Sequence, residues 1–185
     1  MELDDLVEAV EQARTRFLTT IIHVSPAQAA FRVHPDAWSI AEIAEHLVHA
    51  ESGGINLIWR AAEGVASGTP VWQGEPPHRG LTIEQVVDRT WRARETSPDS
   101  ALPRLGGPLA HWAAALRGCS GLLLELKSVL SGLPLEQVIY PHAISGPLDA
   151  RQRLQFLAFH LDRHQRQVAE VMSHPDFPRT GADRA

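Results

Sequence analysis

Two histidines four residues apart are the side chains of this sequence best spaced for metal chemistry. His160 and His164 lie in the stretch 154–172, which has no Gly or Pro and repeats its apolar residues at helical spacing. Residues four apart on a helix have Cβ atoms about 5–6 Å apart, so two imidazoles there can bind one ion. Gln167 follows one turn later on the same face. A protein metal site needs at least three ligands, so the pair requires another from elsewhere.

The third ligand is expected on a second amphipathic helix, predicted over residues 40–63. Ser39 and Glu42 form a capping-box pattern at its start. His46 lies at the edge of the apolar stripe, where its side chain can face inward between helices. His49, three residues on, is the competitor, as a ligand, a neighbour of the site or a surface residue. Three neutral imidazoles would leave a position for water or substrate, although the histidines can also be core residues that bind no metal.

The elements that must position these histidines are helical throughout. The apolar spacing predicts four long helices, at residues 3–22, 40–63, 109–130 and 154–172, and no strand. A shorter helix is predicted at 82–95, within the long connection between the second and third helices. Gly118 and Gly121 in the third helix indicate a close approach by another helix. The expected fold is all-α, a four-helix bundle forming one domain over residues 1–172, followed by a flexible tail at 173–185.

The composition excludes several classes of partner. The formal net charge of −5 disfavours nucleic-acid binding. No apolar run approaches the roughly 20 residues of a membrane span, and the start of the chain is acidic, so we expect a cytoplasmic protein without membrane contact. The single cysteine, Cys119, excludes an internal disulfide and is expected to be buried rather than a catalytic thiol. The arginines of the last helix alternate with acidic residues and are expected on its solvated face: Arg151, Arg153, Arg163 and Arg166.

Three segments together resemble one family. Residues 38–46, Trp-Ser-Ile-Ala-Glu-Ile-Ala-Glu-His, look like the second-helix signature of the DinB-like superfamily of damage-inducible helical bundles. Residues 159–167 are similar to its last-helix motif, His-x-x-Arg-His-x-x-Gln. Residues 140–148 resemble the family's His-Pro…Gly-x-Leu approach to that helix, but Pro and His stand in reverse order, so no role is carried over to His142. The matching elements spread over residues 3–172.

The resemblance implies an up-down-down-up bundle, a homodimer, and a divalent metal held by His46, His160 and His164. Zinc or nickel is favoured, with iron, manganese or copper as alternatives. Characterised members include transferases and isomerases that use low-molecular-weight thiols, so the leading hypothesis is a thiol transferase acting on a small electrophile. The alternatives are a metal-dependent hydrolase and a non-catalytic metal-binding stress-response module. Arg163 or Arg166 could steer an anionic small-molecule substrate, although a surface ion pair is the favoured interpretation of both residues. No catalytic residue is identified.

Overall fold

The computed structural model describes residues 1–92 and 97–179 of the chain. Most of these residues are helical, with one small hairpin. The elements in chain order are α1 (Leu3–Ile21), α2 (Pro26–Ala30), α3 (Ile40–Ala66), α4 (Ile83–Thr90), the 3₁₀ turn η1 (Asp99–Ala101), α5 (Leu109–Leu130), β1 (Ile139–His142), β2 (Gly146–Asp149) and α6 (Ala150–Met172). The expectation of an essentially all-α protein is therefore confirmed.

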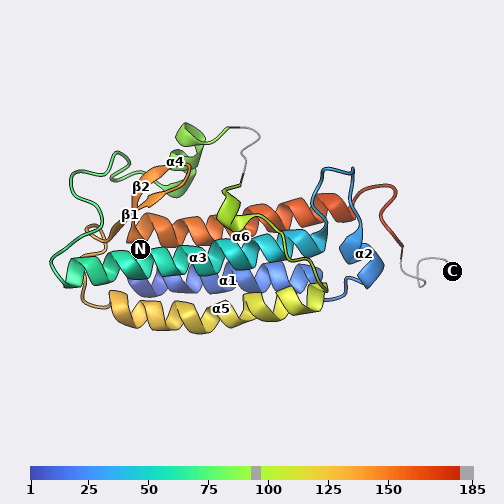
Figure 1. The fold of residues 1–185 in the computed structure, drawn as a ribbon, viewed down its shortest axis with the longest axis horizontal. Coiled ribbons are helices and arrows are strands. Elements are labelled where there is room, and N and C mark those ends of the chain that lie inside the picture. Colours follow the sequence, from blue (N-terminus) through green and yellow to red (C-terminus); the bar gives the residue numbers. More distant parts are fainter. Residues whose placement is uncertain (93–96, 180–185) are drawn as a thin grey trace.

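Four long helices, α1, α3, α5 and α6, lie side by side along the length of the molecule (Figure 1). The most extensive contacts join α1 to α6 and α3 to α5. Their apolar stripes meet in one core, in which Phe17, Leu47, Leu126 and Leu154 are inaccessible to solvent or nearly so. The helix α4 and the hairpin lie beside the first half of α6, outside the four long helices (Figure 1).

Local capping explains where the two histidine-bearing helices begin. Ser39 caps α3 through the predicted box, in which its hydroxyl accepts from the Glu42 backbone N–H and the Glu42 carboxylate accepts from the Ser39 N–H. Asp149 caps α6 in the same way with Gln152, so this helix begins four residues before the predicted 154–172 stretch. These caps satisfy backbone donors that would otherwise be unpaired.

The connections contain the predicted short helix, α4, but they differ from the sequence predictions in two respects. The short helix predicted over 82–95 ends at Thr90, and Trp91 is extended; residues 93–96 lie outside the described residues. The β1–β2 hairpin was not predicted, because Pro141 and Pro147 obscure the alternation of a strand. These prolines face one another in the antiparallel register, and Gly146 turns the chain with a φ of 73°.

The close helix approach also lies elsewhere than predicted. A Cβ built on Gly118 or Gly121 meets nothing within 4 Å, so no other helix of the chain packs there among the described residues. The close approach is at Gly54 on α3, where an added Cβ would lie 3.0 Å from Cδ2 of Leu157 on α6. The small side chain of Gly54 thus lets the two histidine-bearing helices come together.

A buried ion pair crosses the core away from the histidines. Arg14 on α1 and Glu51 on α3 have side chains about 2% exposed, and Nε of Arg14 donates to Oε1 of Glu51 over 3.0 Å. Arg14 also donates to Ser120 on α5 over 2.7 Å and pairs with the half-buried Glu11. This network joins three of the long helices.

Beyond α6 the described part of the chain turns back onto α2. The Gln28 amide donates to the carbonyl oxygen of Pro178 over 2.8 Å, and Phe31 meets Phe177 edge to face. Residues 180–185 of the predicted flexible tail lie outside the described residues. No helix in the described part is long and apolar enough to cross a membrane.

Candidate metal centre

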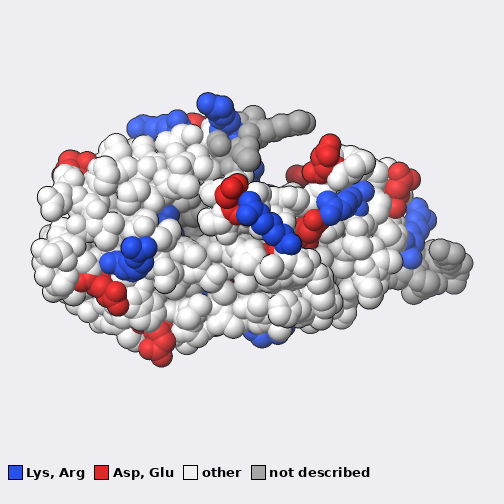
Figure 2. Space-filling view, in the orientation of Figure 1, with Lys and Arg blue, Asp and Glu red and all other residues white. Residues whose placement is uncertain are grey.

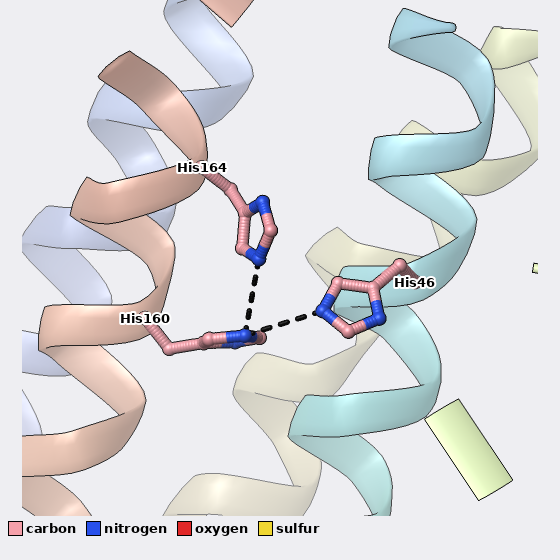
Figure 3. Close-up of side chains that lie close together, drawn as sticks. All are labelled: His46, His160 and His164. Carbon is pink, nitrogen blue, oxygen red and sulfur yellow. Dashed lines mark hydrogen bonds between the residues drawn. The ribbon is translucent and has the colours of Figure 1, made fainter. Parts of the chain in front are cut away.

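Three imidazole rings from two helices converge on one point in the interior (Figure 3). His46 comes from α3, and His160 and His164 from successive turns of α6. The Nε2 atom of His160 lies 3.2 Å from Nε2 of His46 and 3.1 Å from Nε2 of His164. All three ligand atoms lie within 4.8 Å of one another. The side chains predicted to hold a metal are thus brought together by the fold.

The outward nitrogens of two rings are held by hydrogen bonds. Nδ1–H of His46 donates to the carbonyl oxygen of Ala101 over 2.7 Å, and Nδ1–H of His164 donates to Oε1 of Gln167 over 2.7 Å. These partners fix the tautomer, because a carbonyl oxygen can only accept. The lone pairs of both Nε2 atoms therefore point toward the centre, as they do in metal-binding histidines.

Burial keeps the three imidazoles neutral. It lowers the pKa of His46, lowers that of His160 well below its usual value, and lowers that of His164 to about 3, with the other histidines adding to the shift for His160 and His164. Trp38 packs on the His46 ring at 4.8 Å between centroids, and Phe156 stacks on the His160 ring at 5.4 Å. These aromatic rings shield the centre from solvent.

The donor set fits a divalent transition metal. Metal–imidazole distances of about 2.0–2.1 Å in tetrahedral geometry place ligand nitrogens about 3.3 Å apart, close to the two Nε2 separations in the cluster. The Nε2 atoms of His46 and His164 are both acceptors, and the neutral ring of His160 has at most one N–H proton to offer them. A bound cation would satisfy all three nitrogens at once. Neutral imidazoles and inward-facing lone pairs are therefore the features of a site that can hold a metal.

The comparison with protein families decides the relationship. The model of the DinB superfamily matches residues 9–168, which include all three histidines. The chain belongs to the DinB superfamily. A search of curated proteins found no match.

A loop far along the sequence completes the centre of this DinB-superfamily protein. Glu45, next to His46 on α3, is 1% exposed, and its carboxylate accepts the backbone N–H groups of Arg104, Leu105 and Gly106 over 2.6, 2.6 and 2.9 Å. Burial raises the pKa of Glu45, but these three donors outweigh it and hold the pKa below its usual value. The anchored loop brings the Ala101 carbonyl to His46.

The other predicted site residues surround the three histidines without joining them. His49 lines the adjoining cavity, and its Nε2 lies 3.6 Å from Oε1 of Glu45. Arg163 is exposed at the cavity, with its guanidinium 5.5 Å from the centre of the Trp91 ring. Gln167 contacts His164 as described. The aromatic partner of Arg163 could not be anticipated, because 72 positions separate the two residues in sequence.

The DinB-superfamily chain has a cavity of about 800 Å³ beside the histidines. Its walls come from α3, α6, the hairpin and the segment around η1, and they include His46, His160 and His164. Figure 2 shows this face hollowed between the part that carries α4 and the hairpin and the part formed by α3. A cavity of this size admits a small organic molecule to the histidine cluster.

Sequence reasoning placed Arg153 wrongly. It was expected on the solvated face of the last helix, yet it is 5% exposed and lines the cavity. The helical period does contain a signal, because Arg153 precedes His160 by two turns and therefore shares its inward face. The sequence prediction followed the charge of Arg153, which favours an exposed position, rather than its place on the helical face.

His142 and Cys119 have different surroundings. Nδ1 of His142 accepts the backbone N–H groups of Ile144 and Ser145, and burial, followed by the charge of Arg153, lowers its pKa to about 3. Cys119 is buried on α5, and burial, followed by the charge of Glu51, raises its pKa to about 11. A neutral thiol within the helix packing is not an activated nucleophile, in agreement with the sequence expectation.

Proposed function

We propose that His46, His160 and His164 bind one divalent metal ion. The observation that carries this proposal is the convergence of three neutral rings, two of which have their outer nitrogens held by Ala101 and Gln167. Zinc or nickel suits such a nitrogen donor set, and iron, manganese or copper are alternatives. A three-histidine set leaves room for water or a substrate atom, as in catalytic rather than structural zinc sites.

Elemental analysis of untagged protein tests the metal. We expect about one ion per chain in the wild type and its loss in His46→Ala, His160→Ala and His164→Ala. His49→Ala is the matched control, because His49 lines the same cavity outside the cluster and its substitution leaves the metal content unchanged. Metal content that is unchanged in all three cluster variants would contradict the proposal.

We further propose that the protein is a metal-dependent enzyme that transfers a low-molecular-weight thiol to a small electrophile in the cytoplasm. A divalent metal held by the three histidines would lower the pKa of a thiol or water bound to it. The protein's own contribution is to orient the three imidazoles, exclude bulk water through Trp38 and Phe156, and hold the reactants in the cavity. Superfamily membership and the size of the cavity support this reaction class.

A panel of activities distinguishes this reaction from the alternatives. Metal-loaded protein is assayed with several thiols paired with electrophiles, and separately with ester and amide substrates. Thiol consumption that disappears in His160→Ala supports the transferase, whereas hydrolysis with the same dependence would indicate a hydrolase. Metal binding without turnover in either panel would contradict an enzymatic role and favour the non-catalytic stress-response module.

We also infer the superfamily's up-down-down-up helix order and a homodimer. The colour course in Figure 1 supports the order, with α1 and α6 running one way and α3 and α5 the other. The outer face of α5 supports a dimer, because it exposes Leu122, Leu124 and the open surface over Gly118 and Gly121. Light scattering after size exclusion tests the dimer, and a monomer that persists at high protein concentration would contradict it.

A further inference from the structure

Arg153 is a buried cation with no hydrogen-bond or ion-pair partner among the described residues, and the electrostatic neighbour that raises its pKa is the phenol of Tyr140. Its side chain leaves α6 near the start of the helix, is 5% exposed and lines the cavity that contains the histidines. No hydrogen bond, ion pair or stacked ring reaches its guanidinium group among residues 1–92 and 97–179. The contrast is Arg14, which is equally buried but pairs with Glu51 and Glu11.

Burying a charge without a partner lowers the stability of the folded protein, so a buried unpaired arginine points to a role outside folding. Removing a cation from water is repaid only by an opposing charge and hydrogen bonds, and Arg153 has neither within the described chain. Burial lowers the pKa of Arg153 only to about 10, so the group stays protonated at neutral pH. The guanidinium at the cavity wall therefore carries five N–H donors, and no described residue accepts a hydrogen bond from them.

Neighbouring side chains complete a subsite around this cation. Because Nδ1 of His142 accepts two backbone N–H groups, the ring proton is on Nε2, which makes this neutral ring a second donor at the cavity wall. Phe156 packs against the His142 ring at 4.5 Å between centroids, and Trp91 stacks on the same His142 ring at 6.3 Å. The subsite thus combines one positive charge, one neutral donor and aromatic walls.

The charge balance of the cavity indicates the sign of its ligand. The charged residues among the described cavity lining are Arg153, Arg163 and Asp36, and of these only Arg153 is buried. The cavity wall is therefore cationic within a chain whose formal net charge is −5. A single guanidinium among aromatic rings balances one negative charge, and its planar fork matches the two oxygens of a carboxylate.

The helix sets the distance between this subsite and the histidines. Arg153 and His160 are seven residues apart, which corresponds to two turns and about 10 Å along the axis of α6 on the same face. Phe156 lies between them and stacks on His160. A ligand with one end at the histidines and the other at Arg153 must span roughly this length along an aromatic wall.

We infer that Arg153 binds the carboxylate of an elongated monoanionic ligand whose other end reaches the histidine cluster. This inference rests on the proposed function for the identity of the reacting end, since that end is a thiol or an electrophile at the metal. Arg153 and His142 thus define the substrate class as a carboxylic acid with its reactive group about 10 Å away.

Equilibrium binding to protein stripped of metal tests the anion subsite without any activity. The probes are octanoate and octanol, which differ in the carboxylate, and octyl phosphate, which presents a dianion. We expect octanoate to bind the wild type at least about tenfold more tightly than octanol, as for a charged hydrogen-bonded pair. Arg153→Gln removes this preference and leaves octanol binding unchanged. Arg151→Gln, on the same helix but outside the cavity lining, retains it.

Equal affinities for octanoate and octanol in the wild type would overturn the inference, as would a preference that survives Arg153→Gln. Tighter binding of octyl phosphate than of octanoate would overturn the carboxylate assignment. Circular dichroism checks that Arg153→Gln is folded. Arg153→Lys serves as a second variant: it keeps the charge but loses the planar fork, so it retains only part of the preference for octanoate.

A second series in metal-loaded protein separates this inference from the proposed function. The probes are ω-mercaptoalkanoates and ω-mercaptoalkanols of increasing chain length. Tight binding that depends on the thiol but is equal for acids and alcohols would support the metal centre and overturn the role of Arg153. An Arg153-dependent preference for the acids without any gain from the thiol would support the anion subsite and contradict the thiol transferase. We expect both contributions, with affinity greatest at the length that spans about 10 Å.

Discussion

The carbonyl oxygen of Ala101 lies 2.7 Å from Nδ1 of His46, and this contact joins a loop to the histidine cluster across 55 positions of sequence. The loop is held in place by Glu45, the residue next to His46, through three backbone N–H groups. The two neighbouring side chains of α3 therefore have different roles. His46 presents a nitrogen to the histidine cluster, and Glu45 positions the loop whose Ala101 carbonyl orients the His46 ring.

Glu45→Gln is expected to weaken both the loop and the metal site. Gln has one acceptor oxygen where the buried carboxylate has two, so at least one of the three N–H groups loses its partner, at a cost of about 1 kcal/mol of unfolding free energy. Hydrogen exchange at residues 104–106 should accelerate, and metal affinity should fall by about 10-fold or more as His46 loses its orienting contact. Glu42→Gln is the control, because it weakens the cap of α3 without touching the loop. Unchanged exchange at residues 104–106 would contradict this role.

Gln167→Leu is expected to lower metal affinity with little loss of stability. Oε1 of Gln167 accepts from Nδ1 of His164, and without it the ring is free to change tautomer and rotate. We expect a loss of about 10–100-fold in competition with a chromophoric chelator. Gln165→Leu, on the same helix as Gln167, removes a contact to Thr20 of α1 and should bind metal like the wild type. Equal affinities for the two variants would rule out the orienting role.

Removing only Arg14 from its buried ion pair with Glu51 should destabilise the protein far more than removing both residues. Arg14→Met leaves the Glu51 carboxylate buried without its cation, at an expected cost of about 3–5 kcal/mol of unfolding free energy. The double variant Arg14→Met/Glu51→Leu should recover most of this loss, because the remaining partner of Arg14, Glu11, is partly exposed and no fully buried charge is left uncompensated. Urea unfolding of the two variants gives the comparison. A double variant as unstable as the single one would show that the pair is needed for packing rather than for charge balance.

Cys119 should remain a thiol throughout the neutral range. Burial raises its pKa from 9.0 to about 11, so its folded-state contribution to stability is fully present below pH 9 and is lost as the pH rises through about 11. Thiolate absorbance of the native protein should therefore appear only near pH 11, whereas protein unfolded in denaturant titrates near pH 9. Rapid reaction with a disulfide reagent at pH 8 in the folded protein would contradict this expectation.

The sequence by itself determined the features that depend on local spacing. The positions of His160 and His164 on one helical face follow from 3.6 residues per turn, and the Ser39–Glu42 cap follows from short-range hydrogen bonds. The inward placement of His46 could also be predicted, because it lies at the edge of an apolar stripe that must be buried. These inferences need no knowledge of which helices are neighbours.

Only the tertiary structure decided which polar groups are buried and paired. Glu45 and Arg153 resemble surface charges in the sequence, but the 104–106 loop covers one and the hairpin side of the cavity encloses the other. The burial of a charged side chain depends on segments distant in sequence, whose approach no local period encodes. The same reason explains why Gly54, rather than Gly118 or Gly121, marks the close helix contact: a glycine's role depends on the neighbour that the fold brings to it.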